Sequence, residues 1–415
     1  MIYREINECR ICGNKNLYTV VELGEMALTG VFPNKDEVVE SGPLTLVKCD
    51  DRDGISCGLL QLAHNYLPEK LYGDNYGYRS GLNRSMVAHL QGIVNQIKNK
   101  IQINEGDTIL DIGSNDGTLL GLYNLDNVNY VGMDPTIKKF GFYYKPNIKK
   151  IADFFGSKRF QEEMGDKKAK VITSIAMFYD LERPLDIMAQ IYDVLDDDGI
   201  WVVEQSYMPR MIDNVSYDTI CHEHLEYYTI RQFSWMANRI GFKIIDIELN
   251  EANGASFRVT LAKKKSSHTG NEKMVRAIIE AEEARNLSEP KTYEDFKTAI
   301  FKHKKDLTDF VKNATKTGKK VYGYGASTKG NVILQLCQFN KNDIPLIGEV
   351  NDYKFGRLAP GTDIEIVSES EVKELNPDYL LVLPWHFKDN IIGKEQEYLS
   401  KGGKLVFPLP KIEIV

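Results

Sequence analysis

Four of the six cysteines lie within the first 57 positions of the 415-residue chain, at Cys9, Cys12, Cys49 and Cys57. Two residues separate the first pair, and seven separate the second, a wider gap than zinc sites usually have. A structural zinc ion binds four soft ligands as a tetrahedron, and four thiolates leave no open position for catalysis. Six cysteines are too few for a disulfide scaffold in a chain of this length. We therefore predict a structural zinc site on these four thiols, with four metal-free cysteines as the alternative.

A glycine-rich turn follows an apolar run in the segment 109–120, which reads ILDIGSNDGTLL. The pattern predicts a strand, a tight turn and the start of a helix. Gly113 and Gly117 let the backbone approach a ligand that side chains would exclude. The N-terminus of the helix would present free N–H groups to an anionic group. Asp134, which ends the next predicted strand, can accept hydrogen bonds from both hydroxyls of a ribose.

This loop differs from the Gly-x-Gly-x-x-Gly pattern of nicotinamide-binding domains. The acid at position 111, the Gly-x-x-x-Gly spacing and the acid after the next strand resemble the cofactor loop of class I methyltransferases. The resemblance implies S-adenosylmethionine as cofactor, with its carboxylate at the helix N-terminus, its ribose on Asp134 and its adenine near Asp153. A strand, turn and helix with a purely structural role is the alternative. The residues predicted to bind the cofactor are Asp111, Gly113, Asn115, Gly117, Asp134 and Asp153.

Two of the seven histidines, His222 and His224, flank Glu223. This segment follows a predicted strand that ends near Gln205, so we expect it at the carboxyl edge of the sheet, where open α/β sheets bind ligands. An imidazole titrates near neutral pH and suits a general base. Glu223 can orient such a base or act as one itself. A metal site on the two histidines, or polar surface side chains without a role, are the alternatives.

Strand-like and helix-like segments alternate through the middle of the chain. Apolar residues recur at spacings of three and four in a predicted helix from about Ser80 to Lys100. The alternation predicts an α/β sheet that ends in an antiparallel pair. The predicted strands are Thr108–Ile112, Tyr130–Met133, Val171–Ile175, Ile200–Glu204, Phe242–Leu249 and Phe257–Ala262.

A second α/β unit is predicted after a polar stretch. We interpret residues 263–271 as a linker and 272–318 as one or two solvated helices, interrupted near Pro290. A glycine turn that carries Ser327 and Lys329 opens this unit, and its two hydroxyls and one cation suit a phosphate group. The turn lacks the P-loop spacing, so nucleotide hydrolysis is not expected. The predicted elements are strands at Lys320–Tyr324, Leu346–Val350, Tyr379–Leu383 and Lys404–Phe407, and a helix at Asn331–Gln338.

Composition and charge exclude several classes of function. A net charge of -7 and a pI near 5.7 give no basic surface for a nucleic-acid backbone. No run approaches the ~20 apolar residues that a membrane span needs. The first residues of the chain are too polar for a secretory signal. We therefore expect a cytoplasmic enzyme without nucleic-acid or membrane partners; a monomer is compatible with the sequence, which specifies no oligomeric state.

With these motifs in order, the chain resembles the sugar C-methyltransferases that act on nucleotide-linked keto-deoxysugars. The resemblance covers nearly the whole length. Besides the four cysteines, the cofactor loop and the segment 222–224, it rests on five shorter motifs. These motifs are Gly58–Leu62, Tyr76–Ser80, Gly254–Val259, Tyr324–Asn331 and Pro360–Thr362.

The resemblance implies a catalytic base, a sugar pocket and a nucleotide site. The base is the second histidine, His224, and His222 is an orienting or structural residue beside Glu223. Tyr76 lines the sugar pocket and completes the expected catalytic group. The C-terminal domain binds the diphosphate of the substrate through its glycine turn. The residues predicted to bind the nucleotide sugar are Tyr78, Ser256, Arg258, Ser327, Thr328 and Lys329.

Two positions depart from the family pattern. Cys221 stands where the family places a tyrosine, and Ala176–Asp180 stands where the family tends to carry Asn and His. Both positions touch the sugar pocket, so methylation of a sugar hydroxyl is the alternative reaction. A non-catalytic protein that binds a sugar nucleotide or the cofactor is the alternative from another class.

We therefore predict an α/β protein of three domains. They are a zinc-binding module (1–79), a class I, Rossmann-like methyltransferase domain (80–265) and a C-terminal Rossmann-like domain that binds the sugar nucleotide (266–415). The predicted reaction methylates a carbon of a nucleotide-linked deoxysugar beside its keto group. In it, His224 removes the neighbouring proton and the resulting enolate carbon attacks the methyl group of the cofactor.

Overall fold

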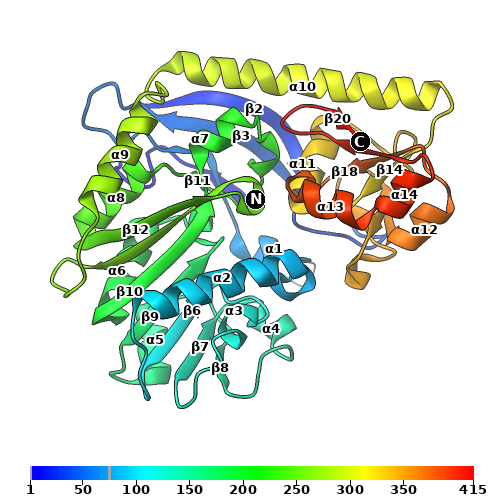
Figure 1. Cartoon of the computed structure of the whole chain (residues 1–415). Helices are drawn as coiled ribbons and strands as arrows, with labels where there is room; N and C mark the ends of the chain where they lie inside the picture. The colour runs from blue at the N-terminus through cyan, green and yellow to red at the C-terminus, as the bar shows by residue number, and fades with distance from the viewer. Residues whose placement is uncertain (1, 73–75) are drawn as a thin grey trace.

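The computed structural model describes residues 2–72 and 76–415 and arranges them in three connected parts (Figure 1). The N-terminal part is mostly β-structure: the long strand β2 pairs antiparallel with β3, β3 with β4, and β1 with β5. Its elements are β1 (Tyr3–Glu5), β2 (Leu17–Ala27), β3 (Ser41–Cys49), β4 (Leu60–Leu62), β5 (His64–Tyr66), α1 (Pro68–Leu71) and the 3-10 turn η1 (Ser80–Leu82).

The middle part is a seven-stranded sheet with the strand order β12-β13-β10-β9-β6-β7-β8, in which only β13 runs antiparallel to its neighbours. Its strands are β6 (Thr108–Ile112), β7 (Asn129–Met133), β8 (Ile148–Ile151), β9 (Ala169–Ile175), β10 (Leu195–Ser206), β12 (Phe242–Asn250) and β13 (Ser256–Lys263). Its helices and turns are α2 (Arg84–Lys100), α3 (Thr118–Gly121), α4 (Ile137–Phe140), α5 (Ser157–Met164), η2 (Phe178–Asp180), α6 (Pro184–Val194), α7 (Met208–Asp213), η3 (Tyr217–Thr219), α8 (Ile230–Ile240) and η4 (Ala252–Gly254).

The strand order places a ligand crevice at β6. From β6 the chain adds β7 and β8 on one side and then returns to add β9 and β10 on the other. Open α/β sheets bind ligands at the carboxyl ends of the strands where the order reverses. The glycine turn after β6 and the segment after β9 meet at this point.

The six strands predicted for the middle of the chain are confirmed, and one strand was missed. β8 reads Ile-Lys-Lys-Ile and lies at the edge of the sheet, where its two lysines are exposed. A short edge strand with a polar centre lacks the apolar run that identifies a buried strand. The helix predicted after the glycine turn is α3, which is a single turn.

The C-terminal part is a second seven-stranded sheet with the order β16-β17-β15-β14-β18-β19-β20. Its five central strands are parallel, and short antiparallel strands close both edges. Its elements are β14 (Val321–Tyr324), α11 (Thr328–Leu336), β15 (Leu346–Glu349), η5 (Asp352–Lys354), β16 (Leu358–Ala359), β17 (Ile364–Ser368), α12 (Glu369–Glu374), β18 (Tyr379–Val382), η6 (Trp385–Phe387), α13 (Lys388–Lys394), α14 (Gln396–Ser400), β19 (Lys404–Phe407) and β20 (Glu413–Ile414).

Two helices join the middle and C-terminal sheets. They are α9 (Glu272–Glu283) and α10 (Pro290–Lys316), and the break predicted near Pro290 is confirmed because proline is the first residue of α10. The α9 helix packs against α8 and β12 of the middle part. The α10 helix crosses the molecule above β2 and reaches the C-terminal sheet (Figure 1). No helix in the described ranges is both long and apolar enough to cross a membrane.

The N-terminal part is packed into both of its neighbours. Side chains of β2 and β3 share a hydrophobic core with α11 and the C-terminal sheet. The cysteine-bearing turns share another core with α6, α8 and the middle sheet. A two-residue strand from the middle part, β11 (Glu226–Tyr227), pairs with β4 and completes the four-stranded N-terminal sheet. The three parts are therefore interlocked around the segment that contains His222, Glu223 and His224.

Candidate active site

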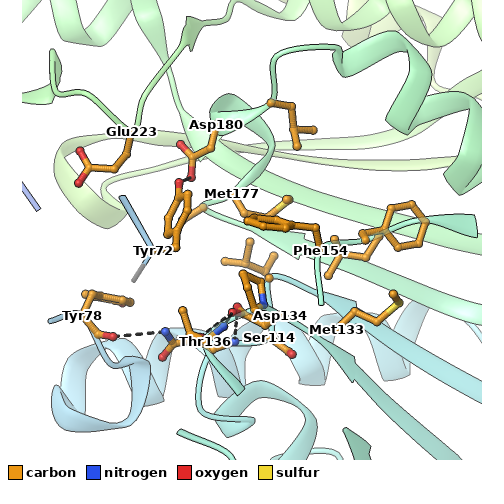
Figure 2. Close-up of a pocket in the computed structure, with 18 of the residues that line it drawn as sticks. Tyr72, Tyr78, Ser114, Met133, Asp134, Thr136, Phe154, Met177, Asp180 and Glu223 are labelled. Atoms are coloured by element: carbon orange, nitrogen blue, oxygen red, sulfur yellow. Dashed lines mark hydrogen bonds between the residues drawn. The ribbon is translucent and has the colours of Figure 1, made fainter. Parts of the chain in front are cut away.

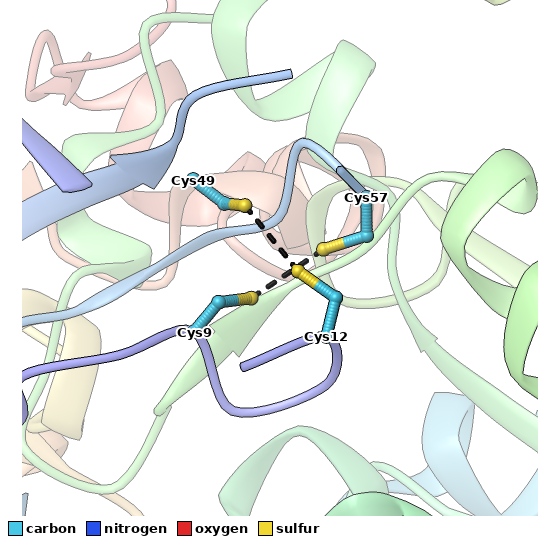
Figure 3. A group of neighbouring side chains, drawn as sticks. All are labelled: Cys9, Cys12, Cys49 and Cys57. Carbon is cyan, nitrogen blue, oxygen red and sulfur yellow. Dashed lines mark hydrogen bonds between the residues drawn. The ribbon is translucent and has the colours of Figure 1, made fainter. Parts of the chain in front are cut away.

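The four predicted zinc ligands converge in the N-terminal part (Figure 3). Their sulfur atoms all lie within 4.8 Å of one another. The Sγ–Sγ distance is 3.4 Å between Cys9 and Cys57 and 3.6 Å between Cys12 and Cys49. Zinc–sulfur bonds of about 2.3 Å in a tetrahedron place sulfurs about 3.8 Å apart. The donor atoms and their spacing therefore fit a zinc ion.

The cysteine cluster has the features of a structural site. Cys9, Cys49 and Cys57 are buried, and the side-chain amide of Asn14 donates to the sulfur of Cys49 at 3.5 Å. Four thiolate ligands close the coordination sphere, so a bound zinc would have no position for a substrate. The ion would instead hold the turns before β2 and β4 against the middle sheet.

One cavity of about 400 Å³ opens at the carboxyl ends of β6, β7 and β9. Figure 2 shows the glycine turn with Ser114 and Asp134 at one end, and Asp180 and Glu223 at the other. Aromatic and apolar side chains line the walls between these ends. These wall residues include Tyr72, Tyr76, Tyr78, Met133, Phe154 and Met177.

The glycines of the turn are required by its geometry. Gly113 and Gly117 have φ values of 74° and 75°, the left-handed region that side chains disfavour. A Cβ at Gly113 would lie 2.9 Å from the side chain of Met177, and one at Gly117 would lie 2.8 Å from the ring of Tyr144. The Tyr144 hydroxyl also donates to the carbonyl of Asn115 at 3.0 Å. Tyr144 thus packs on the turn from outside the cavity, and Met177 packs on it from within the cavity wall.

The two acids predicted at the cofactor end both line the cavity. Asp134 accepts hydrogen bonds from the backbone N–H of Asn115 at 2.9 Å and from the backbone N–H of Thr136 at 2.6 Å. Burial raises the pKa of Asp134. Burial also raises the pKa of Asp111 to about 7, although the Thr173 hydroxyl donates to it at 2.5 Å. These residues and the glycine turn fit the ribose and methionine ends of S-adenosylmethionine.

Asp153 lies outside this constellation. Its side chain is exposed and accepts a hydrogen bond from the backbone N–H of Phe154 at 2.8 Å. The neighbouring rings of Phe154 and Phe155 line the cavity in its place. The adenine end of the cavity is therefore apolar, and a contact with Asp153 stays a prediction.

The segment 76–80 covers the cofactor turn. Asn115 donates through its side-chain amide to the carbonyl of Tyr78 at 3.3 Å and accepts from the backbone N–H of Ser80 at 2.9 Å. The rings of Tyr76 and Tyr78 both line the cavity, and burial raises the pKa of both hydroxyls. Tyr76 is near Asp134 and also near Asp180 and Glu223, whose end of the cavity we call the acceptor end, whereas Tyr78 lies at the glycine turn.

His222 is a structural residue. Its ring is completely buried, its Nδ1 accepts from the backbone N–H of Thr29 at 3.2 Å, and its Nε2 donates to the carbonyl of Gly42 at 3.3 Å. Burial lowers its pKa to about 4, so the ring is neutral. Both nitrogens are occupied, which excludes the metal pair that was the alternative for His222 and His224.

Glu223 is the member of the segment that lines the cavity. Its carboxyl group packs so closely on Gly30 that a Cβ at that glycine would lie 1.9 Å from Oε1. The Thr29 hydroxyl donates to Oε2 at 3.4 Å. Burial raises the pKa of Glu223.

His224 is held in one tautomer beside the cavity. Its Nδ1 donates to the carbonyl of Thr219 at 2.9 Å, which leaves the lone pair on Nε2. Its ring packs on Tyr179 with 4.4 Å between centroids. Burial and the nearby ammonium of Lys329 lower its pKa to about 3. The ring does not belong to the cavity wall itself, which Glu223 and Leu225 form on either side of it.

The glycine turn of the C-terminal part faces this same segment. Ser327 caps α11 by accepting from the backbone N–H of Gly330 at 3.0 Å, and Thr328 lies near Gly30. The ammonium of Lys329 donates to the carbonyl of Asn253 at 2.7 Å, and burial lowers its pKa. All three predicted diphosphate ligands are partly exposed at the junction of the two sheets, and diphosphate binding stays a prediction.

Ser256 and Arg258 lie away from the cavity. The Ser256 hydroxyl donates to the carbonyl of Ala252 at 2.9 Å. The buried guanidinium of Arg258 pairs with Glu204 at 3.2 Å and with Glu248 at 2.5 Å. The Arg258 pairs join neighbouring strands, because β13 lies between β10 and β12. Neither residue lines the cavity, and the predicted substrate contacts of Ser256 and Arg258 stay a prediction.

Two residues of the acceptor end were not predicted as site residues. Tyr72 and Asp180 line the cavity, and the Tyr72 hydroxyl donates to Oδ2 of Asp180 at 2.8 Å (Figure 2). They are 108 residues apart in sequence, and no local pattern joins them. The only sequence signal was that 176–180 departs from the family pattern.

Three family models match successive parts of the chain. Residues 9–72 match "Putative zinc binding domain", 85–247 match "Methyltransferase domain" and 251–410 match "C-methyltransferase C-terminal domain". The zinc-binding match includes all four cysteines of the cluster, and the methyltransferase match includes the glycine turn and Asp134.

Individual proteins add a similarity over the full length. The chain is 27% identical over 416 residues to the C-methyltransferase NovU of Streptomyces niveus, and the alignment covers 100% of this chain and 98% of that protein. Among solved structures, the plantazolicin methyltransferase BpumL in complex with SAH is 16% identical with a TM-score of 0.33, over 42% of this chain and 82% of that chain. The LepI complex with SAM is 13% identical with a TM-score of 0.33, over 44% of this chain and 54% of that chain.

The family matches agree with the geometry of each part. The cysteine cluster lies in the zinc-binding match, and the cavity at β6 lies in the methyltransferase match. The α/β fold predicted for a class I methyltransferase, with an N-terminal zinc module and a second α/β sheet, is confirmed. The protein is an S-adenosylmethionine-dependent C-methyltransferase, of the family that joins an N-terminal zinc-binding domain, a methyltransferase domain and a C-terminal C-methyltransferase domain.

Proposed function

We propose that this enzyme methylates the carbon beside the keto group of a nucleotide-linked deoxysugar. The observation that carries the proposal is the single cavity that joins the cofactor turn to two carboxyl groups, Asp180 and Glu223. A volume of about 400 Å³ is in the usual range for a small-molecule site. The full-length similarity to a C-methyltransferase supports carbon rather than oxygen as the acceptor atom.

The cofactor end is defined by the glycine turn and Asp134. When bound there, S-adenosylmethionine would supply an electrophilic methyl group. The Asp134 carboxyl would bind the ribose, and the turn would accommodate the methionine end. Phe154 and Met177 add apolar surface to the walls of this space.

The acceptor end suits a ring that has both apolar and polar faces. Tyr72, Tyr76 and Tyr78 present flat apolar surface together with hydroxyl groups. Met177 and Leu225 add apolar contacts, and no metal-ligand cluster is found at this end among the residues that the structure describes. A deoxysugar offers the matching combination of C–H faces and oxygen atoms.

His224 is the proposed base. The hydrogen bond from its Nδ1 to Thr219 leaves Nε2 as an acceptor, and burial keeps the ring neutral. A neutral imidazole with a free lone pair can remove the proton next to the keto group. Glu223, which lines the cavity one residue earlier, is the competing candidate for this step.

The nucleotide of the substrate is proposed to bind at the junction with the C-terminal part. Ser327, Thr328 and Lys329 lie there, beside the segment 222–224. The backbone N–H groups at the start of α11 add a positive dipole end. A diphosphate at this position would leave the attached sugar pointing toward the cavity.

The test uses a nucleoside-diphosphate 4-keto-6-deoxyhexose and a cofactor with a ¹³C-labelled methyl group. Carbon NMR of the product should show a C-methyl signal; a methoxy signal would establish O-methylation instead.

Without cofactor, wild type should exchange deuterium from solvent into the carbon beside the ketone. His224→Asn should lower exchange and transfer by ~10²–10⁴-fold, and His222→Asn, the matched control, should keep both where it folds. Absence of methyl transfer across a panel of keto-sugar nucleotides contradicts the proposal, and loss of exchange in Glu223→Gln but not in His224→Asn moves the base to Glu223.

A further inference from the structure

Asp180 lies at the acceptor end of the cavity, with one carboxyl oxygen hydrogen-bonded and the other without a partner among the described residues. It ends η2, directly after β9, and its side chain reaches the same end of the cavity as Glu223 (Figure 2). Oδ2 accepts the hydrogen of the Tyr72 hydroxyl at 2.8 Å. Oδ1 is enclosed and has no hydrogen-bond partner among the described residues. An enclosed oxygen without a partner points to a ligand group that completes its bonding.

The surroundings of Asp180 disfavour a negative charge. Burial, followed by the neighbouring carboxyl of Glu223, raises the pKa of Asp180 well above its ordinary value, and only the hydrogen bond from Tyr72 opposes this. The cation nearest in sequence, Arg183, is exposed and pairs with Asp186 at 2.6 Å. The other titratable groups that face Asp180 are Tyr76, Tyr179, Cys221, Glu226 and Tyr227. None of these groups carries a positive charge.

A neutral Asp180 has one hydrogen to donate. Because Oδ2 accepts from Tyr72, the proton belongs on Oδ1, the oxygen without a partner. A buried O–H donor without an acceptor is unfavourable, because the hydrogen bond it made to water is not replaced. An acceptor oxygen at this end of the cavity removes that penalty, and a keto oxygen has two lone pairs and no hydrogen of its own.

We propose that Asp180 is an uncharged acid that donates its Oδ1 hydrogen to the keto oxygen of the methyl acceptor. The assignment rests on the proposed function and names the ketone as the group that this enzyme recognises. Such a donor is more effective as negative charge develops on the oxygen, because hydrogen bonds to a charged acceptor are stronger. A carboxylic acid in an apolar site can remain neutral at pH 7 for this purpose.

The proton and electron balance of the step is simple. The base takes the proton from the carbon beside the ketone, and the C–H electron pair forms the enolate carbon–carbon double bond while the carbonyl pair moves to oxygen. Asp180 keeps its proton and only shares it with that oxygen. S-adenosylmethionine bound at the glycine turn would supply the methyl group to the enolate carbon, and the electron pair of the methyl–sulfur bond would stay on sulfur as the ketone is restored. The proton on the base is released to solvent.

The first test is independent of substrate. Difference infrared spectra at pH 7 of wild type minus Asp180→Asn should contain the band of a protonated carboxyl group. The matched control, Asp186→Asn, alters an exposed acid six residues away and should give no such band. Absence of the band from the Asp180 difference spectrum overturns the proposal.

The second test uses the same keto-sugar nucleotide, labelled with ¹³C at its carbonyl. The carbonyl stretch of the bound ketone should lie at lower frequency in wild type than in Asp180→Ala. Deuterium exchange should fall ~10²–10³-fold in Asp180→Ala, the usual effect of removing one donor to a developing oxyanion. Asp180→Asn retains an N–H donor and should stay within about tenfold of wild type. Two results overturn the assignment. One is an Asp180→Asn variant as inactive as Asp180→Ala, and the other is a carbonyl frequency in Asp180→Ala equal to that in wild type.

The pH profile separates a hydrogen-bond donor from a structural residue. Exchange by wild type should decline as pH rises through the pKa of Asp180, because the ionised form has no hydrogen to donate. Asp180→Asn should lack this decline. A wild type that shifts the carbonyl but transfers no methyl group contradicts the proposed function and leaves the role of Asp180 standing. Far-UV circular dichroism and affinity for S-adenosylhomocysteine establish that each variant is folded. Where Asp180→Ala does not fold, the infrared band and the pH profile of Asp180→Asn decide whether Asp180 is a neutral donor.

Discussion

Replacement of Asp134 tests the cofactor end of the cavity, because this side chain accepts hydrogen bonds from the glycine turn and also lines the cavity. Its Oδ2 accepts from the backbone N–H of Asn115 at 2.9 Å. Its Oδ1 accepts from the backbone N–H of Thr136 at 2.6 Å and from the Thr136 hydroxyl at 2.5 Å. Asp134→Ala removes these acceptors together with the charge offered to the ribose. Asp134→Asn keeps one acceptor oxygen and removes the charge.

The size of the effect follows from these contacts. A hydrogen bond to a charged group contributes about 1.5–3 kcal/mol. Loss of one such bond to the ribose therefore raises Kd about 10- to 150-fold, since 1.4 kcal/mol is a factor of ten. In Asp134→Ala the buried N–H groups of Asn115 and Thr136 also lose their acceptor, at about 1–3 kcal/mol each. We expect its free energy of unfolding to fall by roughly 2 to 6 kcal/mol.

Isothermal titration with S-adenosylhomocysteine measures Kd, and urea denaturation without ligand measures stability. Burial raises the pKa of Asp134, so the charged form is lost at a higher pH than for an exposed acid, and wild-type affinity should weaken as pH falls. Asp134→Asn should show no such change. Asp153→Asn is the matched control, since that acid is exposed, and its Kd should stay within about threefold of wild type. Unchanged affinity in both folded Asp134 variants would refute the placement of the cofactor.

Three further changes probe other parts of the molecule. Cys12→Ser should lose the one zinc ion per chain that metal analysis of wild type should find, whereas Cys221→Ser should keep it; a folded, zinc-free wild type would exclude the site. His222 has a pKa of about 4 when folded and about 6.5 when unfolded, so its contribution is present at neutral pH and is lost as pH falls. The stability of wild type minus that of His222→Gln should drop by roughly 2 kcal/mol from pH 7.5 to pH 5 in urea denaturation, and a constant difference would contradict the buried neutral ring. Arg258→Gln should lower stability by about 1–3 kcal/mol, because Glu204 loses one hydrogen bond from a charged partner and keeps those to His89 and Asn250. KM for the sugar nucleotide should stay unchanged; a raised KM with normal stability would indicate a substrate contact.

Features that depend on short stretches of chain were predictable from sequence. The glycine turn is one, because Gly113 and Gly117 meet positive φ requirements that only local residues determine. The zinc ligands are another, because few groupings other than a metal site account for four cysteines so close to the start of the chain. Continuous apolar runs also predicted the regular strands of the middle sheet.

Features that depend on distant partners were not predictable. The contact between Asp180 and Tyr72 joins residues 108 positions apart, so no local pattern indicates it. The hydrogen bond from Lys329 to Asn253 depends on how the middle and C-terminal sheets pack together. The ion pairs of Arg258 are a further example. Its partners come from two neighbouring strands, and no spacing rule connects them.

The pairing of β11 with β4 determines which segments of this protein must be inherited together. Tyr227 and Glu226 are in register with Leu60 and Gln61, so the last strand of the N-terminal sheet is encoded more than 160 positions downstream. A recombination event, or an engineered chimaera, that exchanged residues 1–79 with those of a relative would replace one side of this pairing and keep the other. The exchanged sheet would have a mismatched edge directly beside His224. Viable exchanges in this family should therefore carry the segment around β11 with the zinc-binding domain, although the two are far apart in the gene.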